Sequence, residues 1–195
     1  DFGFYPDFTA REFMLYMAAV KGLDVIALTD HNSCKNCPAI LKHGEEYGIT
    51  VIPGMELTTS EEVHVVCLFP ALGDAMAFDG YVYEHLLPIK NREDIFGKQQ
   101  IMDADDQVTG NVERLLIGAT DISFDQVFGL VEAYRGIAYP AHIDKSTTSL
   151  LSNLGFVPPD SSFTCAEIST FDHLHQIQKE HPYFLQCKML SSSDA

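Results

Sequence analysis

Residues 24–32 read DVIALTDHN and contain the pattern that decides the fold. The largely apolar run 24–28 has the length and composition of a strand that is buried on both faces, as in a parallel sheet covered by helices. It changes abruptly to polar residues from Thr29 to Asn32. Because α/β barrel enzymes carry their catalytic groups where strands end and loops begin, this change marks a candidate functional position.

Similar strand-like runs recur along the chain and alternate with helical patterns. Strands are expected at residues 49–53, 63–69, 137–139, 165–168 and 186–190, and capping boxes at 9–12 and 123–126 begin two of the helices. Serial strand–helix units predict an α/β fold with a parallel sheet, either open or closed into a barrel. Six strand candidates without a first element predict a seven-unit barrel, (β/α)7, whose first strand is missing. We expect one domain over residues 1–195, with the polar stretch at about 89–118 as an inserted loop or hairpin.

Composition and charge exclude several classes of function. The formal net charge of −16 argues against an extended nucleic-acid surface, which needs clustered Lys and Arg. No apolar run reaches the roughly 18–20 residues of a membrane-spanning helix, so no membrane partner is expected. The sequence has neither a Gly-rich phosphate loop nor a Gly-x-Ser-x-Gly elbow, which argues against P-loop proteins and serine hydrolases.

The five cysteines are odd in number and scattered. Only Cys34 and Cys37 form a CxxC pair, and no second CxxC accompanies it as a zinc site would require. We interpret them as a reduced pair in a cytoplasmic protein.

Ionisable side chains gather at the predicted strand ends. Asp30 and His31 end the first run and Glu56 the second, while His142 and Asp194 follow two later strands. His64 lies within the neighbouring strand and, with the right parity, points to the same rim. Singly these residues have ordinary explanations, such as a helix cap, a surface ion pair or a hydrogen-bonded strand histidine. Together they favour a metal, because crowded imidazoles and carboxylates are costly without a compensating charge and form the ligand set of Zn, Mn or Fe.

The same residues resemble the motifs of a known family, the PHP (polymerase and histidinol phosphatase) domain, in the right order over essentially the whole chain. Loops at 96–100 and 153–156 are similar to a bacterial subgroup of stand-alone PHP phosphoesterases. The four motifs are Thr29-Asp30-His31-Asn32, Gly54-Met55-Glu56 with His64, Ala141-His142, and Ser193-Asp194.

This resemblance implies a distorted TIM-like (β/α)7 barrel that binds two or three divalent ions (Mn, Fe or Zn) and hydrolyses phosphoesters with a metal-activated hydroxide. Asp30 would orient its neighbours rather than bind metal. Lys145 is a candidate phosphate contact, although a solvated loop lysine is the simpler interpretation. No residue is assigned a catalytic role beyond the metal-bound water. The metal ligands implied are His31, Glu56, His64, His142 and Asp194.

Two parts of the family pattern are absent from the sequence. The family opens with a strand that ends in His-x-His, and its last motif is Asp-x-His, whereas this chain ends at Asp194-Ala195. Asp1 and Asp7 are weak substitutes for the first motif. We therefore expect the sequence to be part of a longer protein rather than a degenerate enzyme.

The leading hypothesis is a metal-dependent phosphoesterase that acts on a small phosphorylated metabolite or nucleotide. A non-catalytic metal-binding PHP module, used for stability or protein interaction, is the alternative, and a metal-dependent amidohydrolase is a third. Substrate identity, metal identity and oligomeric state remain open at this level.

Overall fold

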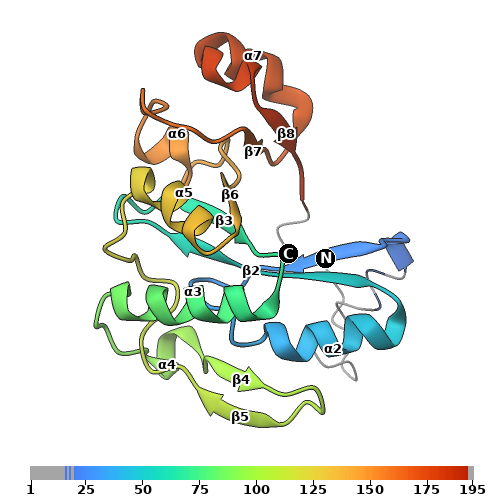
Figure 1. The fold of residues 1–195 in the computed structure, drawn as a ribbon. Coiled ribbons are helices and arrows are strands. Elements are labelled where there is room, and N and C mark those ends of the chain that lie inside the picture. Colours follow the sequence, from blue (N-terminus) through green and yellow to red (C-terminus); the bar gives the residue numbers. More distant parts are fainter. Residues whose placement is uncertain (1–15, 17, 19, 193–195) are drawn as a thin grey trace.

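The computed structural model describes residues 16, 18 and 20–192 of the chain and shows an α/β fold (Figure 1). Its strands are β1 (Val25–Leu28), β2 (Thr50–Thr58), β3 (His64–Leu68), β4 (Gln100–Met102), β5 (Val108–Asn111), β6 (Ile137–Pro140), β7 (Cys165–Glu167) and β8 (Lys188–Leu190). Its α-helices are α2 (Cys37–Tyr47), α3 (Leu72–His85), α4 (Glu93–Phe96), α5 (Phe124–Ala133), α6 (Leu150–Asn153) and α7 (Leu174–Glu180). Short 3-10 helices cover Phe171–His173 and Pro182–Leu185.

The central sheet has four strands in the order β1-β2-β3-β6. Strands β1 and β2 are parallel, but β3 runs antiparallel to both of its neighbours, β2 and β6. The expectation of an all-parallel sheet is therefore wrong at β3. The reason is the short connection between β2 and β3, since a parallel crossover needs about a dozen residues and only 59–63 separate these strands.

Strands β7 and β8 form a separate parallel pair, which the backbone links to the end of β6 through a hydrogen bond from Ile143 N to Glu167 O (2.9 Å). Strands β4 and β5 form an antiparallel hairpin within the polar stretch 89–118. Among the described residues the strands thus form sheets of four, two and two, and no closed barrel is found.

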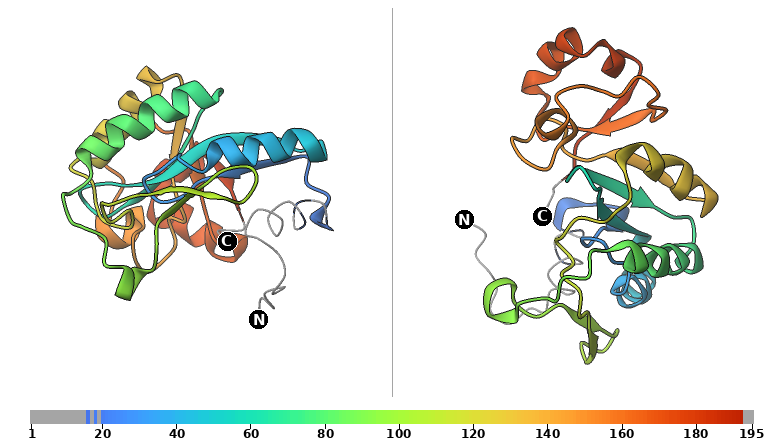
Figure 2. Two further views of the ribbon diagram at one scale, coloured as in Figure 1. Left: turned by 90° about the horizontal axis from the view of Figure 1, so that it is seen from below. Right: turned by 90° about the vertical axis from the view of Figure 1, so that its left-hand side faces the viewer.

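The hairpin and the β7–β8 pair lie at opposite ends of the molecule (Figures 1 and 2). The apolar core fills the space between the central sheet and its helices. Phe78 on α3 packs between Phe69 and Tyr134, with ring centroids 5.0 and 5.4 Å away. This core fixes the position of the sheet edge on which the histidines gather.

Two glycines allow a close approach or a left-handed turn that other residues would strain. Gly54 in β2 lies so close to β3 that a Cβ atom would come within 2.5 Å of the Cys67 carbonyl oxygen. Gly48 ends α2 with φ of +71°, and its N–H bonds to the Gly44 carbonyl.

Candidate metal centre

Glu56 is the centre of the site, and it lies inside β2 rather than at its end. The strand extends to Thr58, five residues beyond the predicted boundary at residue 53 and two beyond Glu56. The backbone of β1 continues far enough for His31 to form a parallel bridge with Glu56, and Glu56 N donates to Asp30 O (3.0 Å). This pairing places the His31 side chain beside the Glu56 carboxylate.

His64 reaches the same carboxylate because β3 is antiparallel. It is the first residue of β3 and pairs with Thr58, so the beginning of β3 lies beside the last residues of β2. In a parallel strand of the same length, a first residue would lie at the far edge of the sheet. The reversed direction thus explains why a histidine at the start of a strand joins groups at the ends of others.

His142 follows β6 directly and completes the group. Ala141 N donates to His64 O (3.0 Å), which joins the end of β6 to the beginning of β3. His142 has φ of +28° and is only 3% exposed. A positive φ is uncommon for a residue with a Cβ atom, and such backbone conformations often accompany functional sites.

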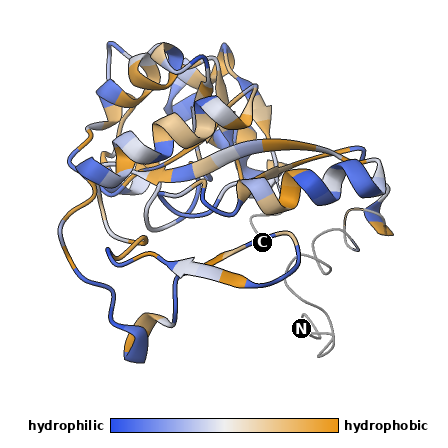
Figure 3. Ribbon diagram, turned by 60° about the horizontal axis from the view of Figure 1, so that its bottom comes forward, coloured by the Kyte–Doolittle hydropathy of each residue, from blue (hydrophilic) through white to orange (hydrophobic). Residues whose placement is uncertain are grey.

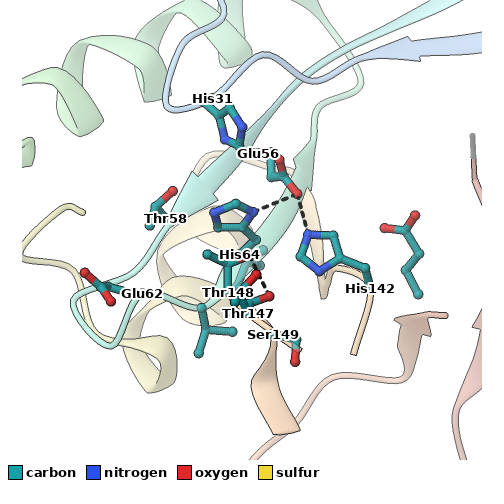
Figure 4. Close-up of polar contacts among 12 residues, drawn as sticks. His31, Glu56, Thr58, Glu62, His64, His142, Thr147, Thr148 and Ser149 are labelled. Atoms are coloured by element: carbon teal, nitrogen blue, oxygen red, sulfur yellow. Dashed lines mark hydrogen bonds and ion pairs between the residues drawn. The ribbon is translucent and has the colours of Figure 1, made fainter. Parts of the chain in front are cut away.

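Three imidazoles therefore face one carboxylate (Figure 4). Glu56 Oε1 lies 3.2 Å from His64 Nδ1 and 3.1 Å from His142 Nε2, and Glu56 Oε2 lies 3.3 Å from His31 Nδ1. Burial by itself would raise the pKa of Glu56, but the contacts with His142 and His64 outweigh burial and hold this pKa below its usual value. The carboxylate is thus ionised at neutral pH and supplies a buried negative charge.

The donor set fits a divalent cation. One ligand atom from each of His31, Glu56 and His64 lies within 4.8 Å of the others. His142 Nδ1 is buried without a hydrogen-bond partner among the described residues. Unpaired buried polar atoms are costly, and mixed imidazole and carboxylate ligands suit Zn, Mn or Fe. The residues present can therefore hold a metal.

The remaining predicted residues lie around this centre or outside the described part of the chain. Asp30 accepts a hydrogen bond from Asn36 Nδ2 (3.2 Å), while burial raises its pKa and this bond partly offsets the rise. Lys145 is exposed, and its backbone N–H donates to His142 O (2.9 Å), so its proposed contact with phosphate stays a prediction. Asp194, Asp1 and Asp7 lie outside the described residues.

Two buried polar residues near this centre had no role assigned from the sequence. Asn32 is 1% exposed, and its side chain joins the loop after His31 to residues more than 80 positions away. Glu167 is 4% exposed at the end of β7, where its carboxylate accepts a hydrogen bond from Ser192 Oγ. The only local signal was a polar residue at the end of an apolar run, which is the same signal that identified Glu56.

The fold and the site define an α/β protein with a histidine–carboxylate centre on the edge of its central sheet. The family model of the PHP domain matches residues 11–154. The chain therefore belongs to the PHP domain family, as its motifs indicate. No curated protein matches the sequence.

Solved structures share the fold at low sequence identity. The lesion-specific endonuclease PfuEndoQ from Pyrococcus furiosus is 16% identical, with a TM-score of 0.59 over 93% of this chain and 42% of its own. Endonuclease Q in complex with a 27-mer duplex carrying an abasic lesion is 15% identical, with a TM-score of 0.56 over 97% and 45%. A protein from Bifidobacterium adolescentis whose proposed class is metal-dependent phosphoesterase is 15% identical, with a TM-score of 0.55 over 96% and 82%. The chain thus spans less than half the length of the two endonuclease structures.

These comparisons correct one expectation. The net charge predicted that no extended nucleic-acid surface is present, and the family hypothesis predicted a small phosphorylated substrate. This combined expectation is wrong because two structures of the same fold are endonucleases, one of them solved with duplex DNA. Net charge averages over the whole surface, whereas substrate binding depends on the local field. Within the described residues, no helix has the length and apolar character required to cross a membrane.

Proposed function

We propose that this protein is a metal-dependent phosphoesterase that hydrolyses phosphodiester bonds of a nucleic acid. The observation that carries the proposal is the convergence of His31, His64 and His142 on the Glu56 carboxylate at one edge of the sheet. The nucleic-acid substrate is proposed by analogy with the endonucleases of the same fold.

The chain's own residues would prepare the site in three ways. Glu56 supplies a fixed negative charge, and the three imidazoles supply nitrogen ligands around it. The β2–β3 pairing and the hydrogen bond from Ala141 N to His64 O hold these groups in place before any ligand arrives. A divalent ion held there supplies an activated water molecule and offsets the charge of a phosphate group.

Two further roles extend the proposal. His31, Glu56, His64 and His142 are proposed as metal ligands, with Asp194 as a fifth, and Asp30 is proposed to orient the loop that bears His31. Mn, Fe and Zn all suit this set of ligands. That the strands complete a distorted (β/α)7 barrel as one domain stays a prediction.

Hydrolysis of bis(p-nitrophenyl) phosphate by the purified chain with added Mn²⁺ tests the proposal. We expect release of p-nitrophenol and loss of at least about 90% of the activity in His142→Ala, since loss of groups at such centres costs roughly 10- to 100-fold. His175→Ala, which removes an exposed imidazole from α7, is the matched control and should retain activity.

Elemental analysis of the same samples separates the proposal from its alternative. Bound metal together with turnover supports the phosphoesterase. Bound metal without turnover on any phosphodiester would instead identify a non-catalytic metal-binding module.

A further inference from the structure

A cavity of about 320 Å³ opens beside His31. One wall is the loop after β1, including Asp30, His31 and Asn36, and the other is the stretch 96–117 of the insertion. Its volume is at the lower end of the roughly 300–1,000 Å³ range of small-molecule sites. The cavity therefore has space for one ligand unit beside the candidate metal centre.

Asn32 fixes the insertion to the loop that bears His31. Its Nδ2 donates to Leu116 O (2.7 Å) and Gly118 O (2.8 Å), while its Oδ1 accepts from Thr58 N (2.9 Å). One buried amide thus joins the loop, the end of β2 and the far end of the insertion. All three of its hydrogen-bonding partners are backbone groups, so the arrangement depends little on side-chain rotamers.

A second set of amides fixes the near end of the insertion. Asn36 Oδ1 accepts from Met102 N (3.0 Å), and Gln99 Nε2 donates to Val112 O (3.0 Å) and Arg114 O (2.7 Å). These bonds tie the two arms of the insertion to each other and to the loop. The cavity wall is accordingly held in place by specific hydrogen bonds.

The insertion presents a cation and apolar side chains to this cavity. Lys98 lines it, is exposed and forms no salt bridge among the described residues. Phe96 and Ile117 also line it and are 48% and 50% exposed. Figure 3 shows hydrophobic residues on the insertion. In a chain of formal net charge −16, an unpaired lysine beside an exposed aromatic ring suits a ligand that is both anionic and flat.

We propose that this cavity holds a single unpaired nucleotide of a nucleic-acid strand, with its base against Phe96 and Ile117 and its phosphate between Lys98 and His31. The inference rests on the proposed function and identifies the part of the nucleic-acid substrate that the cavity binds. A base on an aromatic face contributes binding without sequence preference, and enzymes that act on a duplex often take one nucleotide out of the stack. The site would then need only a local positive charge rather than a broad basic surface.

Binding of two short fluorescent single strands of equal length tests the inference. One strand carries bases throughout, and the other has abasic spacers, so that the phosphates are the same and only the bases differ. Affinity is measured by fluorescence anisotropy at low ionic strength with Mg²⁺, and strand integrity is checked on a denaturing gel. The wild-type chain should bind the strand with bases about tenfold more tightly, as expected for stacking of one base.

Phe96→Ala should abolish this tenfold preference and leave the affinity for the abasic strand within about twofold, because it removes stacking alone. Phe156→Ala is the matched control, since Phe156 is similarly exposed (54%) but does not line the cavity. Lys98→Gln should weaken the binding of both strands to the same extent and reduce its salt dependence.

Equal affinity for the two strands, no binding of either, or an equal effect of Phe96→Ala and Phe156→Ala would each overturn the inference. Because binding is read without turnover, an absence of hydrolysis would count against the proposed function alone. Hydrolysis that is unchanged in Phe96→Ala, with no preference for bases, would count against this inference alone.

Discussion

Two clusters of potential metal ligands lie beside β2, one built around a carboxylate and the other around two thiols. In the first, Glu56 faces three imidazoles and stays ionised. In the second, Cys34 and Cys37 are fully buried and their thiols bond to Gly54 O at 3.1 and 3.6 Å. Both clusters contain residue types that bind metals, so residue type alone does not distinguish them.

The difference comes from the partner that each group meets. A hydrogen bond with Cys37 and burial raise the pKa of Cys34, burial raises that of Cys67, and the hydrogen bond with Cys34 lowers that of Cys37. Metals bind thiolates, and a neutral thiol that donates to a carbonyl, as Cys34 does to Gly54 O, is a packing residue. The Glu56 carboxylate meets imidazoles instead of carbonyls, and its negative charge can attract a cation.

The largest expected effect follows from removing that charge. Glu56→Gln keeps the shape of the side chain but leaves three imidazoles around a neutral amide. We expect metal content to fall below half of the wild-type value and phosphodiesterase activity to fall on the order of 100-fold. Elemental analysis and p-nitrophenol release measure the two effects, and full metal occupancy in this variant would show that Glu56 is not a ligand.

The loop that connects the two clusters should depend strongly on Asp79. This carboxylate on α3 is 2% exposed, accepts from Ser33 Oγ (3.1 Å) and Cys34 N (2.8 Å), and pairs with the Lys35 ammonium group. Asp79→Ala should lower the free energy of unfolding by about 2–4 kcal/mol, because it leaves buried donors without an acceptor. Urea denaturation measures this change.

Asp74→Ala on the same helix is the control for Asp79→Ala. Asp74 pairs with Arg135, whose side chain is 74% exposed, so this pair should contribute less than about 1 kcal/mol. Equal losses in the two variants would contradict the anchoring role of Asp79.

Gly54→Ala tests the close packing of β2 against β3, next to both clusters. The added Cβ would meet Cys67 O at 2.5 Å and Leu68 Cδ2 at 2.8 Å, so β2 and β3 would have to separate. We expect a loss of about 1–3 kcal/mol in unfolding free energy. Gly73→Ala, where a Cβ would meet nothing within 4 Å, should leave stability unchanged or slightly raised. Similar thermal denaturation of the two variants would argue against the close approach.

The smallest effect is expected for Cys37→Ala. The thiol lies in the core and its hydrogen bond is long, so its loss should cost less than about 1.5 kcal/mol. Metal content and activity should match those of the wild type. Loss of metal from Cys37→Ala would show that the thiol cluster, and not only the histidine cluster, contributes ligands.

Much of the site was predictable from local patterns. The apolar run before Asp30 and His31, and the runs before Glu56 and His142, placed these residues near strand ends, and the structure brings three of them to one edge. The predicted boundary of β2 was five residues short, because the strand was expected to stop at residue 53, before Gly54-Met55-Glu56. A glycine inside a strand produced this error, since glycine more often marks a turn.

The sequence by itself determined the alternation of strands and helices, the family, and which ionisable residues follow buried runs. Only the tertiary structure decided the antiparallel direction of β3, which places His64 beside Glu56, and the docking of the insertion through Asn32. The physical reason is that hydrophobic periodicity records burial but not strand direction. The hydrogen bonds of Asn32 join residues more than 80 positions apart and leave no trace in any local pattern.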